Sequence, residues 1–206
     1  MRIRAVPAVP AVRSVLPVVG LLLAFFSGAC QAHADAASLA GGFASGFMHP
    51  VLGMDHVVAM VAVGLWGVFL GGSAVWLLPV VFPTVMALGG TLGVAGVPLP
   101  GVEIGIAVSA IVIGAMVALA AKPPHGVAAL IVGAFAVFHG YAHGAELPQA
   151  ANALAFSAGF VVATGLLHLA GIAFGLLARW PLGLHLVRLT GGAISLTGLG
   201  FLAGHL

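Results

Sequence analysis

The chain has 206 residues, of which 62% are hydrophobic and 5% are charged, and its mean hydropathy is +1.26. Such a chain has too little polar surface to cover a soluble globule, so the composition predicts an integral membrane protein. The pI near 9.3 reflects six basic and four acidic residues scattered singly, which excludes a basic surface for nucleic acid. The single cysteine, Cys30, excludes an internal disulfide and a site of several thiolates. Any bound metal must therefore meet nitrogen and oxygen ligands.

Residues 1–32 are predicted to form a secretory signal peptide. Three arginines precede an apolar run, and small residues follow it. Cleavage is expected after Ala32 or after Ala34, because both sites have small residues at the minus-three and minus-one positions. Two alternatives stay open, a lipoprotein signal that ends at Cys30 and an uncleaved signal anchor that adds one helix. The mature chain, residues 33–206, is expected to form one membrane domain.

Six membrane-spanning helices are predicted after the signal, because each span needs about 20 predominantly apolar residues. Charged residues are rare in this part of the chain, and prolines concentrate between the apolar runs, where helix breaks are expected. The expected helices cover residues of about 50–70, 74–96, 102–121, 126–146, 150–178 and 186–205. The predicted fold class is therefore an all-α membrane protein, built as a six-helix bundle.

The distribution of charge predicts how this bundle is oriented. With the mature amino terminus outside, the inner loops carry Lys122, Arg179 and Arg188, as the positive-inside rule requires. Asp55 and Glu103 then lie near the outer ends of helices, as does Glu146, and a mouth lined by carboxylates attracts cations. For Glu103 an ordinary outer position is an equal alternative. We expect a multi-pass protein of the bacterial inner membrane with its mature amino terminus in the periplasm.

A first motif, residues 49–56, combines two histidines with a carboxylate. His49 and His56 are seven residues apart and would align on one helical face. However, Pro50 and Gly53 indicate that the helix begins inside the motif. Asp55 is about 100° from His56 around a helix, so we expect it to orient the imidazole rather than bind the metal directly.

A second motif places two histidines and a carboxylate at helical spacing. His139, His143 and Glu146 stand at positions i, i+4 and i+7 and therefore project from one face of a helix. A face of two imidazoles and one carboxylate is half of a metal site. An isolated histidine near the interface is more often an ordinary hydrogen-bonded residue, and we interpret His125, His185 and His205 in that way.

His168 stands in the middle of an apolar segment, where an ionisable residue suggests function. Two interpretations are equally favoured. It is either a deeper relay ligand, with Thr164 one turn before it, or a neutral imidazole bonded to a neighbouring carbonyl. Glu103 is a second relay candidate.

Glycine makes up 31 of the 206 residues, about twice its usual share. Pairs with four-residue spacing let helix backbones approach closely, and we expect them to bring the first and fourth helices together. A homo-oligomer is compatible with such faces. The pairs are Gly67 and Gly71, Gly89 and Gly93, Gly140 and Gly144, and Gly171 and Gly175.

The first motif, followed by Met60, Val63 and Gly64, is similar to the signature of the HupE/UreJ family of hydrogenase- and urease-associated membrane proteins. The second motif, the segment around Glu103 and the Leu167-His168 pair also resemble that family's pattern. The resemblance extends from about residue 33 to the carboxyl terminus.

This resemblance implies a nickel permease that supplies the maturation proteins of a hydrogenase or urease. The implied functional residues are His49, Asp55, His56, His139, His143 and Glu146. The residues alone indicate a divalent metal binder, which suits nickel, cobalt, zinc or copper as transported ion rather than as a permanently bound cofactor. Its partners are then the ion and the lipid bilayer. No enzyme motif is found. Alternatives are a haem-binding membrane protein, with histidines as axial ligands, and a non-transporting accessory subunit.

Overall fold

A computed structural model describes residues 40–146 and 152–204 of the chain. The chain divides into two units, Met1–Ala40 and Gly41–Leu206. The expected signal peptide and both cleavage positions lie outside the described residues and stay predictions. The second unit contains the six segments that the sequence predicts to be helical.

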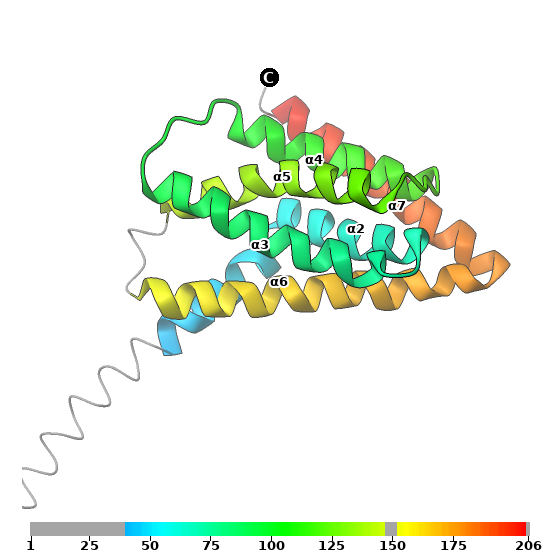
Figure 1. The fold of residues 1–206 in the computed structure, drawn as a ribbon, viewed down its shortest axis with the longest axis horizontal. Helices are drawn as coiled ribbons and strands as arrows, with labels where there is room; N and C mark the ends of the chain where they lie inside the picture. Colours follow the sequence, from blue (N-terminus) through cyan, green and yellow to red (C-terminus); the bar gives the residue numbers. More distant parts are fainter. Residues whose placement is uncertain (1–39, 147–151, 205–206) are drawn as a thin grey trace, which may run out of the picture. The chain divides into compact units, whose positions relative to one another are not determined.

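All regular structure in the described residues is helical (Figure 1), which confirms the all-α class. The elements are a helix at Ala40–Leu52, then α2 (Met54–Leu70), α3 (Ala74–Val94), α4 (Val102–Ala118), α5 (His125–Glu146), α6 (Ala153–Gly175), the 3-10 helix η2 (Leu176–Arg179) and α7 (Pro181–Gly204).

Four of these segments are long and apolar enough to cross a membrane, which supports a multi-pass membrane protein. They are α3, α5, α6 together with η2, and α7. A fifth span results if Ala40–Leu52 and α2 form one bent span. Helix α4 has 17 residues and is shorter. Six spans stay a prediction.

The first motif lies across a bend between two helices, not on one helix as the spacing of its histidines suggested. The helix Ala40–Leu52 meets α2 at an angle of 77°. Pro50 lacks the N–H that would continue the helical hydrogen bonds, and Gly53 is extended, with φ −78° and ψ 108°. His49 and His56 therefore come from different helices, and their seven-residue spacing does not align them on one face.

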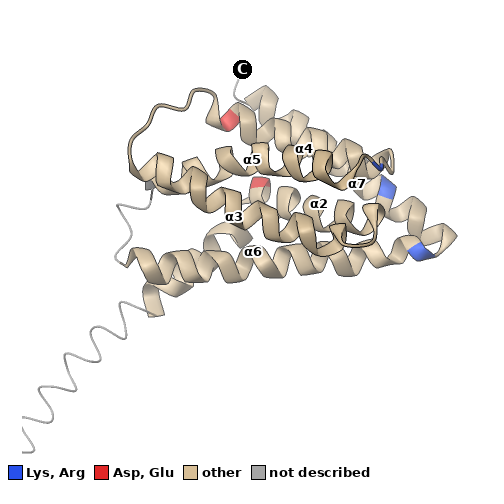
Figure 2. Cartoon of the chain, in the orientation of Figure 1, with Lys and Arg blue, Asp and Glu red and all other residues tan. Residues whose placement is uncertain are grey.

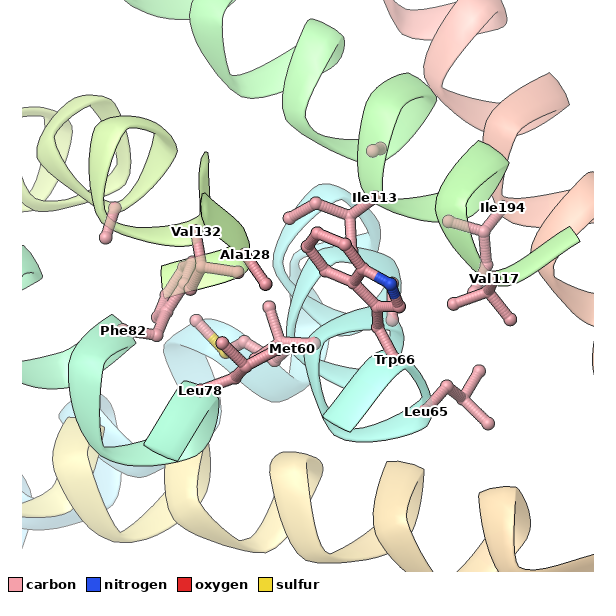
Figure 3. Packing of buried hydrophobic residues seen from close by; sticks show 14 of the residues in the cluster. Met60, Leu65, Trp66, Leu78, Phe82, Ile113, Val117, Ala128, Val132 and Ile194 are labelled. Carbon is pink, nitrogen blue, oxygen red and sulfur yellow. The ribbon is translucent and has the colours of Figure 1, made fainter. Parts of the chain in front are cut away.

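Helix α2 lies at the centre of the packing. The helices pack most extensively as three pairs, α3 with α5, α4 with α7, and α2 with α6, while α2 also contacts α3, α4 and α7. Figure 3 shows Met60 and Trp66 of α2 reaching into a core shared with Phe82 of α3 and Ile113 of α4. The indole Nε1 of Trp66 donates a hydrogen bond of 2.9 Å to the carbonyl oxygen of Ala121, beyond the end of α4.

Glycines set the closest helix contacts, but they join α5 to α3 rather than to α2. A side chain at Gly140 would meet the backbone of Met86, and one at Gly144 would meet the backbone of Gly90. On α3, Gly89 and Gly93 lie equally close to the backbone of α5. The expectation that such pairs bring α2 and α5 together is therefore replaced by an α3–α5 contact.

Charged residues separate along the helices (Figure 2). Asp55 and Glu103 lie in the first turns of α2 and α4 and line one cavity. At the opposite ends of these helices, Lys122 and Arg179 line a second cavity, and Arg188 donates a hydrogen bond to the carbonyl oxygen of Ala118. The predicted segregation of described acids from bases is thus present in the fold.

The glycine contact leads to a stability prediction. Gly140→Val should lower the apparent melting temperature of the purified protein by about 5 °C or more, because the new side chain forces α5 away from α3. Gly126→Val, on the same helix, is the control, since a Cβ at Gly126 has open space around it. Equal melting temperatures for the two variants would contradict the contact.

Candidate metal centre

Three histidines from three helices meet in one cluster. His49 comes from Ala40–Leu52, His56 from α2 and His143 from α5, and one ring nitrogen of each lies within 4.8 Å of the other two. His56 is buried, and the other two are partly buried. We call these three residues the outer cluster. It unites ligands from both sequence motifs.

A direct contact joins the two motifs. Nε2 of His56 and Nε2 of His143 are 2.6 Å apart, so one ring donates its N–H to the other. On the far side of His56, Oδ1 of Asp55 lies 2.8 Å from Nδ1, an ion-pair distance without the alignment of a hydrogen bond. A carboxylate behind a ligating imidazole orients the ring and makes it a stronger ligand. The orienting role of Asp55 stays a prediction, and this contact is the position that it requires.

The bend at Gly53 is part of the same arrangement. The carbonyl oxygen of His49 accepts a hydrogen bond of 3.1 Å from the N–H of Gly53. A Cβ at Gly53 would lie 2.9 Å from Nδ1 of His56 and 3.0 Å from Oδ1 of Asp55. A side chain there would disturb the pair, so the glycine leaves room for the side chains of Asp55 and His56.

Helix α6 completes the wall around His49. The helix Ala40–Leu52 packs closely on the beginning of α6, where Gly46 lies against the backbone of Phe156 and Gly159 against that of Phe43. The ring of Phe160 lies 4.3 Å from that of His143 and 6.1 Å from that of His49, measured between centroids. The outer cluster is therefore flanked by aromatic rings, which limit the water around it.

His139 lies one turn before His143 and is fully buried. Its ring centroid is 5.4 Å from that of His56. The Ser109 hydroxyl donates to the carbonyl oxygen of Ile106 at 2.6 Å, so it accepts from Nε2–H of His139 at 3.0 Å. The lone pair of His139 is then on Nδ1, which has no hydrogen-bond partner in the described structure. His139 is thus prepared as a neutral ligand next to the outer cluster.

The three carboxylates of the predicted site have different positions. Asp55 contacts His56 and shares a cavity of about 140 Å³ with the exposed Glu103. Glu103 is not part of the outer cluster. Glu146 is the last residue of α5, and its side chain lies outside the described residues. The cavity thus brings together two carboxylates, which favour cations, and one of them, Asp55, contacts His56.

His168 does not join the outer cluster. The ring of Phe82, on α3, contacts both His139 and His168, with centroid distances of 5.4 Å and 5.5 Å. His168 is therefore outside the three-histidine group but shares an aromatic neighbour with His139.

Three neighbours of the histidines were not predicted from the sequence. Ser109 fixes the tautomer of His139, Phe82 contacts both His139 and His168, and Phe160 contacts His143 of the outer cluster. A serine or phenylalanine in an apolar helix carries no spacing signal that distinguishes it from packing residues. Only the contacts identify them.

The donor set suits a borderline divalent metal ion. Imidazole nitrogens bind nickel, copper, zinc and iron, and a pair of nearby carboxylates adds affinity for cations. A metal ion bound by both Nε2 atoms would need a lone pair on each, so the ring that donates in the pair would carry its proton on Nδ1 instead and both imidazoles would stay neutral.

Comparison with known proteins gives two matches. The protein family described as HupE / UreJ protein matches residues 21–201 of this chain. The chain is also 46% identical over 173 residues to Protein HupE of Rhizobium leguminosarum bv. viciae, an overlap that covers 84% of this chain and 91% of that protein. No solved structure matches.

The geometry predicts which side chains control metal affinity. His143→Ala should weaken binding of ⁶³Ni²⁺ to the purified protein by more than about 100-fold, and Asp55→Asn by about 10- to 100-fold, since Asp55 acts through His56. Equilibrium dialysis measures both effects. His185→Ala is the matched control, because His185 is exposed on α7. An unchanged dissociation constant in His143→Ala would contradict the outer cluster as a ligand set.

Proposed function

The chain belongs to the HupE/UreJ family, and from this premise we propose that it carries a divalent transition-metal ion, nickel in the first place, across the inner membrane. The resemblance that the two motifs carry is confirmed. The family consists of membrane transport and accessory proteins rather than enzymes. The enzyme supplied with the metal is proposed to be a hydrogenase or a urease, the two enzymes with which this family is associated.

The observation that carries this proposal is the outer cluster. Three imidazoles from three helices converge inside an apolar bundle, and the two nearest share one proton over 2.6 Å. Burying imidazoles among apolar helices is unfavourable unless they bind something. A divalent ion with a preference for nitrogen ligands meets that condition.

Capture begins at the acidic end of the helices. Asp55 and Glu103 line the small cavity next to His56 and concentrate cations there. The ion then exchanges water for the imidazoles of the outer cluster, and His139 offers the next nitrogen, Nδ1, at the adjacent position on α5. Glu146 is proposed as a further carboxylate of this mouth.

Orientation follows from the segregated charges. The basic end, with Lys122, Arg179 and Arg188, faces the cytoplasm by the positive-inside rule, and the acidic end faces the periplasm. Import then runs from the carboxylates, through the histidines, toward the basic end. The mature amino terminus is periplasmic in this arrangement.

Uptake by cells tests this function. Cells that express the wild-type chain should accumulate ⁶³Ni²⁺, whereas His56→Ala and His143→Ala should reduce the initial rate about tenfold or more at equal membrane levels. Cobalt, zinc and copper are added as competitors to rank the ions. His185→Ala serves as the control for loss of a histidine as such.

Two results would contradict this proposal. Wild-type accumulation no greater than that of cells without the protein would refute transport and favour a non-transporting accessory subunit. Normal uptake by both variants would show that transport does not use the outer cluster.

A further inference from the structure

Two polar residues of α6 are buried without partners. His168 is 1% exposed and Thr164 is 0% exposed. Neither ring nitrogen of His168 has a hydrogen-bond partner in the described structure, and the Oγ1 of Thr164 has none either. Buried polar atoms in native proteins are nearly always paired, so each exception requires an explanation such as a bound ion or water. Here three unpaired atoms occur within one helical turn.

These two residues form one site by their spacing. Thr164 and His168 are at positions i and i+4 of α6 and lie on the same face of the helix. We call them the inner pair. The alternative expected from the sequence, a His168 imidazole bonded to a neighbouring carbonyl, does not occur, since no such hydrogen bond satisfies either nitrogen.

The inner pair lies next in line after the outer cluster. The ring of Phe82 contacts both His139 and His168. Along α6, His168 follows Phe160 by eight residues, about 12 Å of helix rise, and Phe160 marks the level of His143. The inner pair is therefore displaced from the outer cluster toward the carboxyl end of α6.

A large cavity continues in the same direction. Leu176 lines it, two helical turns beyond His168, together with Val68 of α2. The cavity has a volume of about 630 Å³, and Lys122 and Arg179 are also part of its wall. Positive charges there disfavour rebinding of a cation, so an ion that reaches the cavity is released.

We propose that the inner pair, His168 and Thr164, is a second and weaker binding site for the transported metal ion, between the outer cluster and the basic cavity. This inference rests on the proposed function. The imidazole supplies one nitrogen ligand, the hydroxyl supplies one oxygen ligand, and water completes the coordination sphere. A site with fewer protein ligands than the outer cluster binds loosely, which is what an ion in transit requires.

His168→Leu is the decisive variant. Leucine fills similar space without polar atoms, so the metal-free protein should fold at the wild-type level with an equal or higher melting temperature. The outer cluster is untouched, so its dissociation constant for ⁶³Ni²⁺ should stay within about twofold of wild type. The maximal rate of nickel uptake should fall about tenfold or more. Equilibrium dialysis at saturating nickel should give one bound ion fewer per chain than in the wild type. Thr164→Val should show the same effects more weakly.

Two controls keep the test specific. His185→Leu removes an exposed histidine of α7, and Thr190→Val removes a threonine whose hydroxyl donates to the carbonyl oxygen of Leu186. Both should leave the uptake rate and ion count unchanged.

The results separate the two proposals. A His168→Leu protein with the wild-type uptake rate, or with the wild-type ion count, would overturn the inner site while leaving nickel transport intact. A wild-type protein that takes up no nickel would refute transport itself, and the inner site would fall with it. A lower melting temperature together with a weakened outer cluster would show that His168 serves packing, and would also overturn the proposal.

Discussion

Close backbone contact between helices is the constraint on which the other features depend. Glycines remove the side chains between α3 and α5 and between α2 and α6, where Gly64 lies against the backbone of His168. In a bilayer such contacts replace the hydrophobic driving force that holds soluble bundles together. Because α5 is held by α3 and α6 is held by α2, the imidazoles of both helices face the same interior. The candidate metal site thus depends on glycines, whose lack of a side chain lets the helices pack closely.

Polar atoms in this interior are paired unevenly, and the pattern has a physical meaning. Asp55 contacts His56, His56 pairs with His143, and Ser109 pairs with His139. The side chains of His168 and Thr164 have no hydrogen-bond partner in the described structure. Ligands that other groups orient bind tightly, while unsupported ligands bind loosely. In the proposed transport, a gradient from a strong to a weak site would let an ion enter readily and still leave.

The segregation of charge complements this gradient. Carboxylates line the cavity at the start of α2 and α4, and basic residues line the cavity at their far ends. Between these cavities lie the outer cluster with the neighbouring His139, and then the inner pair. A cation is attracted at the acidic end and repelled at the basic end. The electrostatic potential therefore becomes more positive in the same direction in which the number of candidate ligands falls.

Much of the fold follows from the sequence alone. Hydropathy and the placement of proline predict a helical membrane protein, and each of the six expected segments overlaps one of the helices α2 to α7. The spacing of His139 and His143 placed both on one face of α5, since the period of a helix is a local property. The two motifs also carried the resemblance to the HupE/UreJ family, which is confirmed.

Tertiary structure decided which of these residues meet. The 77° bend at Gly53 moved His49 onto a separate helix, so that it approaches His143 from the side of α6. The glycines of α5 pack against α3, and His168 lies outside the group of His49, His56 and His143. The spacing of residues along a chain shows only which of them share one face of a single helix. Which faces meet depends on the fit between helix surfaces, and that fit exists only when all of them are packed.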